Sequence, residues 1–385
     1  MSDLTTLRTI LDPTEAPDLP DESFELTQSD RTLTDVDFKT PAVGYFRDAL
    51  QRFSQNKASV TAFVIICAIV FMAIFGPGMT PYGFNQQNVD LRNMPPRIPA
   101  LARIGIATGH RTLERRRVEF LEDTERYPMG SIIELRNPTV ISGVEVVDVV
   151  VDYYAYLGVT GSFWFGTDYL GRDYWTRLWR GARVSLVIAF VSVATNLIIG
   201  VIYGAVSGYY GGTVDMVLMR ICEVIEAFPR VVVVTLFILF FGTGLFSIIM
   251  SLIISGWITT ARLVRAQFYR FKLREFVLAA RTMGVRDSVI MFRHVFPNSV
   301  GPIITRTMFA VPLAIFTESF LAYIGLGLQA PEPTIGVLLS DAQRVLLNYP
   351  YQSLFPAVVI SALMISFNLF ANGLRDALDP TMRGV

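Results

Sequence analysis

The sequence predicts an all-α polytopic membrane protein with six transmembrane helices, one N-terminal helix and a five-helix core, and a small extracytoplasmic insertion of mixed structure. Hydrophobic residues make up 52% of the 385 residues, and the mean hydropathy is positive. The charged residues are concentrated between long apolar runs, a pattern typical of several membrane crossings. The net charge of zero says little, because the distribution of charges matters more than their sum. We expect a surrounding lipid bilayer and no nucleic-acid partner.

The N-terminal residues differ in character from the rest. Residues 1–41 are acidic, contain Pro13, Pro17 and Pro20 and have few large apolar groups, so we expect a disordered cytoplasmic tail and no secretion signal. Residues 42–57 are expected to form a short interfacial helix that leads into the membrane. Its apolar side chains recur at helical spacing (Val43, Phe46, Leu50 and Phe53), and its basic side chains can reach lipid headgroups (Arg47, Arg52 and Lys57).

The six spans follow from the lengths of the apolar runs, since roughly twenty apolar residues are needed for one crossing. From Met216 to Val264 the apolar character persists for about 49 residues, or roughly 73 Å as a helix, too long for one crossing. Gly242-Thr243-Gly244 is the expected break in this run. The predicted spans are 58–80 and about 184–207, 216–241, 245–264, 300–325 and 354–370.

The number of spans fixes which segments face the cytoplasm. With six spans and an inside N-terminus, the C-terminal tail and the loop 270–298 are also expected inside. The basic residues in and beside this loop agree with the rule that cytoplasmic loops are positively charged. They are Arg262, Arg265, Arg270, Lys272, Arg274, Arg281, Arg286 and Arg293.

Residues 81–165, between the first two spans, are expected to form a compact extracytoplasmic insertion. It contains several arginines, but long loops are translocated largely regardless of charge. Within it, the highly charged segment 112–126 is interpreted as an exposed helix. The segment 131–153 alternates and is rich in β-branched residues, which predicts a small β element.

The segment 165–186, FGTDYLGRDYWTRLWRGARVSL, precedes the second span. Asp173 is predicted to cap a short helix, because a carboxylate can accept hydrogen bonds from the first free backbone N–H groups. Thr167 and Asp168 are predicted to hold the preceding turn. An interfacial aromatic face is expected on the short helix. Its members are Trp175, Leu178 and Trp179.

The segment 275–297, EFVLAARTMGVRDSVIMFRHVFP, predicts two short helices joined by a sharp bend. Glu275 lies in a first helical turn, where the helix dipole favours a carboxylate. The Ala279–Ala280 pair leaves a flat patch on which another protein can pack. Gly284 can adopt the left-handed conformation that ends a helix. Asp287 then caps the second helix, and Pro297 stops it.

This segment resembles the cytoplasmic coupling loop of bacterial ABC importer membrane subunits. Their pattern is Glu-Ala-Ala, a glycine four residues later and a hydrophobic-Pro ending, and Glu275, Ala279, Ala280, Gly284 and Pro297 take these positions. Further segments in the same order are similar to the oligopeptide/dipeptide/nickel branch, second-permease (OppC/DppC-like) type, over roughly residues 160–380. They are 165–186, Gly208–Gly212 with Asp215 and Arg220, Ala227–Pro229, Ser319–Gln329 and Asn368–Pro380.

The resemblance implies a permease subunit of an ATP-driven importer in the bacterial inner or plasma membrane, with residues 166–385 as its five-helix core. The chain has no G-x-x-x-x-G-K-[ST] phosphate loop, so we expect no enzyme activity and no cofactor of its own. ATP and Mg would be bound by two separate ATPase subunits that dock on the 275–285 coupling helix. A homologous second permease and an extracytoplasmic substrate-binding protein are the other implied partners. The segment 165–186 would be an elbow near the docking face of that binding protein, or an interfacial helix without a partner.

Five charged residues are candidates for the transport pathway or its gate, because charges near a membrane are costly unless they are paired or hydrated. Four have helical spacing at the start of the third span, where Arg220–Glu223 and Glu226–Arg230 can form ion pairs. These four residues either line the transport pathway or belong to a solvated helix end with local ion pairs. Glu318, in the fifth span, has a pathway role or a structural hydrogen-bonding role. Two histidines and two cysteines lack the spacing of metal ligands: His110, His294, Cys67 and Cys222.

The cargo follows from the resemblance alone, which implies oligopeptides or dipeptides, with nickel as the alternative. A secondary transporter, driven by an ion gradient, would be expected to show inverted repeats and helices broken within the membrane. A membrane scaffold or receptor would have no need of the Glu275 loop. Dependence of uptake on separate ATPase subunits discriminates between these classes.

Overall fold

A computed structural model of the protein describes residues 45–378. The chain divides into two units, Met1–Arg47 and Asp48–Val385, and of the first only the start of helix α2 (Tyr45–Gln55) is described. The expected tail 1–41 and the beginning of the expected interfacial helix lie outside the described residues. The second unit contains the rest of α2 and all the other described elements.

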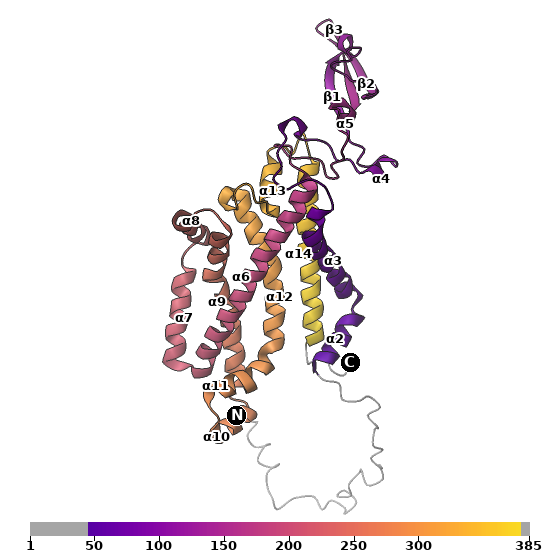
Figure 1. Cartoon of the computed structure of the whole chain (residues 1–385). Coiled ribbons are helices and arrows are strands. Elements are labelled where there is room, and N and C mark those ends of the chain that lie inside the picture. Colours follow the sequence, from indigo (N-terminus) through magenta and orange to yellow (C-terminus); the bar gives the residue numbers. More distant parts are fainter. Residues whose placement is uncertain (1–44, 379–385) are drawn as a thin grey trace, which may run out of the picture. The chain divides into compact units, whose positions relative to one another are not determined.

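The predicted fold class is confirmed, since the described residues are mostly helical with one small sheet. Five helical stretches in this part of the chain are long and apolar enough to cross a membrane, and a bent pair of helices gives a sixth. The five contain α3 (Lys57–Phe75), α6 (Tyr174–Tyr210), α9 (Leu245–Phe271), α12 (Phe296–Leu321) and α14 (Tyr351–Leu378). They lie side by side in a bundle (Figure 1).

The third span differs from the prediction of one helix over 216–241. The chain forms α7 (Gly212–Glu226) and α8 (Arg230–Phe241), bent by 77° relative to each other. Pro229 lies at the bend with an extended ψ of 130°. Proline has no backbone N–H and disfavours a helical conformation in the residue before it, so the helix breaks here. The predicted break at Gly242 is present, where a φ of 78° ends α8 before α9 begins.

Small residues let α6 and α9 pack closely. A Cβ atom added to Gly204 of α6 would lie 2.3 Å from the carbonyl oxygen of Ala261 in α9. One turn later, Gly208 meets the backbone of Arg265 in the same way. Close approach through small residues is a common way for helices to associate in membranes, where lipid tails remove the hydrophobic driving force.

Helix α6 is longer than one crossing of a bilayer requires and longer than the sequence suggests. Asp173 caps it as predicted, accepting a hydrogen bond of 2.9 Å from the backbone N–H of Thr176. The expected short helix is nevertheless wrong, because α6 continues without a break for 37 residues, or about 56 Å. The expected interfacial aromatic face is covered by protein: Leu178 and Trp179 are buried, and the Trp175 indole donates to the carbonyl of Gly76.

A three-stranded antiparallel sheet lies in the connection between α3 and α6. It contains β1 (His110–Arg117), β2 (Ile132–Ile141) and β3 (Val144–Asp152), with β3 in the centre. The predicted β element over 131–153 is therefore confirmed as the β2–β3 hairpin. The helix expected over 112–126 is wrong, because β3 offers a second edge to which β1 pairs. The buried face of the sheet holds Leu113, Val147, Val149 and Val151.

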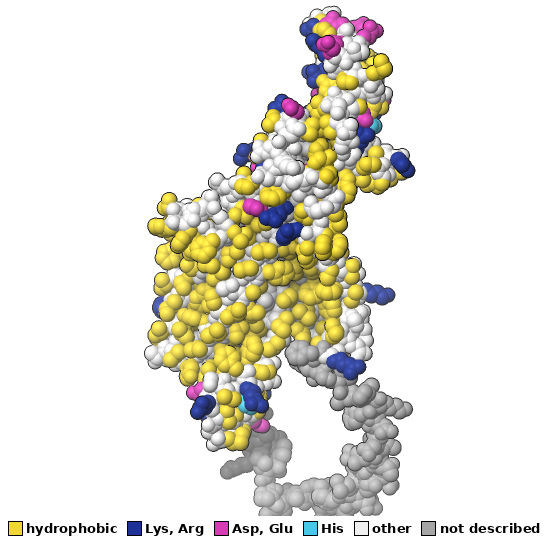
Figure 2. All heavy atoms as spheres, in the orientation of Figure 1, with side chains coloured by type: hydrophobic (Ala, Val, Ile, Leu, Met, Phe, Trp, Pro, Cys, Tyr) yellow, Lys and Arg dark blue, Asp and Glu magenta, His cyan; other side chains and the backbone are white. Residues whose placement is uncertain are grey.

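The helical bundle has two ends that carry different structures. The sheet and α13 (Ile335–Gln343) mark one end, called here the sheet end, and α10 (Glu275–Thr282) marks the other, called the α10 end (Figure 1). Arg111 of β1 joins the sheet to the bundle through a 2.6 Å hydrogen bond to the hydroxyl of Tyr349. Between the ends the surface is almost continuously apolar, while the charged side chains gather toward the ends (Figure 2). This is the surface of a protein surrounded by lipid.

The chain between α10 and α12 forms one continuous helical path. It begins with α11 (Asp287–Val289), widens into the π-helical segment η5 (Ile290–Val295) and continues as α12. The expectation that Pro297 stops a helix is wrong. Pro297 lies in the first turn of α12, where the missing N–H is tolerated because the turn before it is already π-helical. A kinked turn, η6 (Ala322–Leu326), follows α12, and Gly325 within it has a left-handed φ of 89°.

Candidate functional site

The helix α10 is exposed on one face and anchored on the other. Val277 and Ala280 are buried in an apolar cluster with residues of α6, α9 and η5. Glu275 and Ala279 are exposed. The flat patch predicted from both alanines therefore consists of Ala279 alone, because Ala280 faces its own chain. Around Ala279 the surface is apolar, with large exposed side chains at Leu273, Phe276, Leu278 and Met283.

A left-handed glycine ends this helix. Gly284 has a φ of +73°, and no heavy atom lies within 4 Å of the place where a Cβ would be. The glycine is needed for the conformation of the backbone and not for space. It turns the chain from α10 into α11, so that Asp287 begins the next helical segment.

The side chain of Tyr209 holds α10 and α11 against the end of α6. Its hydroxyl donates a hydrogen bond of 2.6 Å to Asp287 Oδ1. The guanidinium of Arg281, in the last turn of α10, lies over the tyrosine ring at 5.3 Å from its centre. Because Tyr209 is itself buried, the two helical segments on either side of Gly284 share one fixed contact point on α6.

A buried carboxylate fastens α6, α7 and α9 together next to this contact. Asp215, in the first turn of α7, accepts hydrogen bonds of 2.5 and 2.6 Å from Nε and Nη2 of Arg265 and one of 3.0 Å from the Tyr269 hydroxyl. Ser207 of α6 also donates to Asp215. A guanidinium that donates two hydrogen bonds to one carboxylate forms the strong and geometrically specific kind of ion pair.

Sequence reasoning did not assign a role to Tyr209, Asp215 or Arg265. The available signal was an acidic residue and an arginine within apolar helices, because such residues near a membrane are kept only when they are paired. Asp215 and Arg265 are 50 positions apart, however, and helical spacing cannot predict a contact between two helices.

Four of the five charged candidates, all except Glu318, lie on α7 and at the start of α8. Arg220 and Glu223 form the predicted ion pair at 2.6 Å, and both are exposed. The predicted Glu226–Arg230 pair is wrong. Glu226 pairs instead with Arg262 of α9 at 2.6 Å, because the bend at Pro229 removes the helical spacing between residues 226 and 230.

Glu318 is buried between three elements. Its Oε2 accepts a hydrogen bond of 2.9 Å from Ser185 of α6, and Ser185 in turn accepts one of 3.3 Å from the backbone N–H of Ile335 in α13. Only 1% of Glu318 is exposed. These hydrogen bonds join α6, α12 and α13 near the sheet end.

The described residues show no metal-binding group. Within residues 45–378, no cluster of three or more His, Cys, Asp or Glu side chains has the geometry to hold a metal ion. The two cysteines are unpaired thiols, with Cys67 exposed on the apolar helix α3 and Cys222 buried in α7.

The apolar surface, the bundle of helices and the exposed apolar side chains of α10 define a polytopic membrane protein. The comparisons with known proteins give the family. Residues 179–384 match the binding-protein-dependent transport system inner membrane component, and residues 44–96 match the N-terminal TM domain of oligopeptide transport permease C. The chain belongs to this family of transporter membrane subunits.

The relatives are similar over nearly their whole length. The dipeptide transport system permease protein DppC of Bacillus subtilis (strain 168) is 34% identical over 372 residues, which is 96% of each chain. The oligopeptide transport system permease protein OppC of the same organism is 34% identical, covering 89% of this chain and 92% of the relative. The dipeptide permease DppC of Lactococcus lactis subsp. cremoris (strain MG1363) is 33% identical, covering 93% and 97%.

Proposed function

We propose that the chain is the permease subunit of an ATP-driven importer that takes up dipeptides or oligopeptides delivered by a binding protein. The similarity to peptide permeases over almost the whole chain supports this cargo. The names of these relatives state dipeptide or oligopeptide transport and not nickel transport, so nickel is not favoured as the cargo. The work of ATP hydrolysis would be done by two separate ATPase subunits, and a homologous second permease would complete the pathway.

The observation that carries the proposal is the two-sided character of α10. One face presents exposed apolar side chains, including Phe276 and Met283, that have no covering element in the described part of the chain. The opposite face is fixed to α6 through Tyr209 and to the apolar cluster around Val277. A helix with these two faces can receive a push from a docked ATPase and pass it to the bundle as a rigid body.

We place the α10 end in the cytoplasm and the sheet end outside. The basic residues of α9, α10 and the segment that follows support this orientation under the positive-inside rule. It places the N- and C-termini in the cytoplasm and makes residues 81–165, with the sheet, an extracytoplasmic insertion. Glu275, Ala279 and Gly284 would then form the ATPase contact, with Ala280 buried beneath it and Pro297 exposed in the first turn of α12.

The test compares two exposed methionines in the assembled importer. Met283→Asp places a charge on the outer side of the α10 turn, and Met129→Asp places the same charge in the sheet insertion, where the methionine is also highly exposed. We expect Met283→Asp to reduce recovery of the ATPase subunits with the permease and ATP-dependent peptide uptake, each by about tenfold or more, since an unpaired charge at the core of an interface is costly. Met129→Asp should leave both unchanged.

Uptake by this chain that persists without ATPase subunits and follows an ion gradient would contradict the proposal. If the ATPase subunits are recovered equally well with both variants, α10 is not their docking surface.

A further inference from the structure

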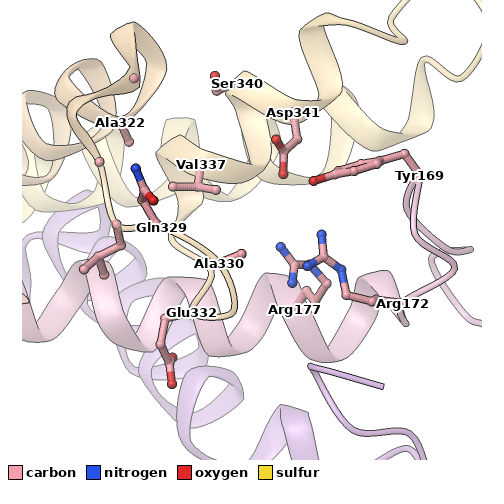
Figure 3. Close-up of a pocket in the computed structure, with 13 residues that line it drawn as sticks. Tyr169, Arg172, Arg177, Ala322, Gln329, Ala330, Glu332, Val337, Ser340 and Asp341 are labelled. Atoms are coloured by element: carbon pink, nitrogen blue, oxygen red, sulfur yellow. The ribbon is translucent and has the colours of Figure 1, made fainter. Parts of the chain in front are cut away.

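A pocket of about 240 Å³ lies at the sheet end, between the residues that lead into α6, the loop after η6 and helix α13. Arg172 and Arg177 form one wall, and Asp341 lies across from them with Tyr169 beside it (Figure 3). The remaining lining comes from the loop and from the neighbouring turn of α13, including Gln329 and Ser340. None of these residues belongs to the α10 site.

The two arginines are buried far more deeply than arginines normally are. Only 1% of Arg172 and 2% of Arg177 is exposed. Buried arginines are rare unless they are paired, because removing a charge from water is costly. Both guanidiniums share one anionic partner, the carboxylate of Asp168, at 2.7 Å from Arg172 Nε and 3.2 Å from Arg177 Nε. In addition, Arg177 Nη1 donates a long hydrogen bond of 3.5 Å to the carbonyl of Phe84, and the Arg172 guanidinium lies over the Tyr169 ring.

Asp168 hydrogen-bonds to Arg172 but not to Arg177. Its Oδ1 already accepts hydrogen bonds from the backbone N–H groups of Leu170 and Arg172, and its Oδ2 accepts the one from Arg172 Nε. The contact to Arg177 lacks hydrogen-bond geometry, and both Arg177 Nε and Arg172 Nη1 are buried without a hydrogen-bond partner. Two positive side chains, each with one buried donor that lacks a hydrogen-bond partner, therefore line the pocket beside a carboxylate that already accepts three hydrogen bonds.

Asp341 does not supply the missing acceptor. Its carboxylate faces the arginines across the pocket (Figure 3), but among the described residues no ion pair joins it to either of them. Burial raises the pKa of Asp341, and the nearby Arg177 and Arg172 oppose this rise only in part. The pocket thus has guanidinium donors on one side and an acidic group on the other.

We propose that this pocket binds the carboxylate end of a short peptide, with the carboxylate held by Arg172 and Arg177. The inference rests on the proposed function and names the group of the cargo that is recognised. The planar guanidinium matches a carboxylate through paired N–H donors. On the opposite wall, Asp341 and the Tyr169 hydroxyl are placed to accept from N–H groups of the terminal residue.

The size and charge of the pocket favour this ligand over other anions. Its volume lies below the roughly 300 Å³ at which pockets for drug-sized ligands begin, so it fits a terminal residue or a dipeptide and not a long chain. A phosphate carries more negative charge than a carboxylate and would be repelled by Asp168 and Asp341. A singly charged carboxylate with neighbouring N–H donors complements both walls.

The test measures binding to the full chain in lipid nanodiscs by isothermal titration calorimetry. The probes are alanyl-alanine and its C-terminal amide, which differ only in the charge at the carboxyl end. We expect the free acid to bind about tenfold or more tightly than the amide, as hydrogen bonds between charged groups are the strong ones. Acetate should compete with alanyl-alanine, and inorganic phosphate should compete less well.

Variants locate the site. Arg172→Gln should abolish the preference for the free acid. Because this variant changes a buried ion pair and can fail to fold, Ser340→Leu provides a second variant that fills the pocket without touching the arginines or Asp168. Its matched control is Ser54→Leu on the exposed face of α2, which should bind as the unchanged protein does. Loss of binding in Ser340→Leu but not in Ser54→Leu supports the site.

Three results would overturn the inference: equal binding of acid and amide, stronger competition by phosphate than by acetate, or unchanged binding in Ser340→Leu. Measuring ATP-dependent peptide uptake by the complete importer in parallel separates the two proposals. If uptake of peptides persists while the acid preference is absent, the pocket assignment fails and the proposed function stands. If no peptide is taken up, the proposed function fails.

Discussion

The hydroxyl of Tyr209, near the end of α6, donates a hydrogen bond of 2.6 Å to the carboxylate of Asp287, the first residue of α11. Through this bond the helical segment after Gly284 is fixed to α6. The same tyrosine ring lies under Arg281 of α10. Tyr209 therefore links α10 and α11 directly to α6, in addition to the connection along the chain into α12.

Removing the Tyr209 hydroxyl should weaken the link between ATP hydrolysis and transport. In Tyr209→Phe the ring stays and the hydrogen bond to Asp287 is lost, which costs about 1 kcal/mol of stability. We expect the complex to assemble and hydrolyse ATP, while the number of peptides transported per ATP falls several-fold. The measurement is the ratio of uptake to phosphate release in proteoliposomes.

The neighbouring residue provides the control for this prediction. Tyr210 is half exposed, and its ring stands edge-on to that of Tyr209. Tyr210→Phe should leave the ratio unchanged. An unchanged ratio in Tyr209→Phe as well would show that the force passes only through the backbone from α10 to α12.

Breaking the Asp215–Arg265 ion pair should destabilise the fold. Asp215→Asn removes a charge that holds α6, α7 and α9 together and leaves the guanidinium of Arg265 without its partner. We expect a loss on the order of 2 kcal/mol, less than the roughly 3–5 kcal/mol of a fully buried pair because the Arg265 side chain is 35% exposed. Thermal unfolding in detergent measures the difference.

The exposed ion pair on α7 is the matched comparison. Arg220 and Glu223 are 75% and 52% exposed, so Glu223→Gln should change stability by less than about 1 kcal/mol. If the two variants unfold at the same temperature, the Asp215 contacts contribute no more than a surface pair does.

Substituting Gly284 should disturb the turn between α10 and α11 without a steric clash. The left-handed conformation costs a residue with a Cβ roughly 1–2 kcal/mol, so Gly284→Ala should shift α10 and reduce both ATPase recovery and uptake. Gly130, in a loop of the sheet insertion, has a φ of +82° and equally open surroundings. Gly130→Ala carries the same strain at a remote place and should leave both quantities unaltered. A loss of uptake in both variants would point to general instability instead.

The pH dependence of stability should include a contribution from Asp173. Burial raises the pKa of this carboxyl group, although hydrogen bonds from Thr176 and Thr80 partly oppose the rise. A raised folded-state pKa means that the folded protein binds the proton more tightly than the unfolded chain. This contribution favours folding at low pH and is lost as the pH rises from the unfolded value to the folded one.

The variant Asp173→Asn keeps an acceptor for the helix cap and removes the titration. Its unfolding temperature, followed from about pH 4 upward, should fall less with rising pH than that of the unchanged chain. An identical slope in both proteins would show that Asp173 titrates as it does in the unfolded state.

The spans and the local signals were predictable because each depends on neighbouring residues. An apolar run of sufficient length predicts a crossing, a glycine such as Gly242 predicts a break, and Asp173 before an apolar helix predicts a cap. The β2–β3 hairpin was predictable from alternation on either side of a turn. These features are decided within a few positions of the chain.

The contacts that define the two sites were not predictable in this way. Arg265 pairs with Asp215 from another helix, and Arg172 and Arg177 share Asp168, for which the sequence predicted only the turn and not the two ion pairs. The strand at 110–117 was mistaken for a charged helix because its pairing partner, β3, follows it by some thirty residues. Tertiary contact overrides local preference in each case. The functions of the coupling residues and of the pathway candidates stay predictions.

The segment η5, just before α12, is π-helical, and a kink at Gly325, with a φ of 89°, follows α12. A π-helical turn holds one residue more than an α-helical turn, and such segments often mark functional sites. If η5 passes its additional residue into α12, the helix rotates about its own axis by one residue, roughly 100°, relative to α11. The faces that α12 presents to lipid and to its neighbours can then change while the connection to α11 stays where it is.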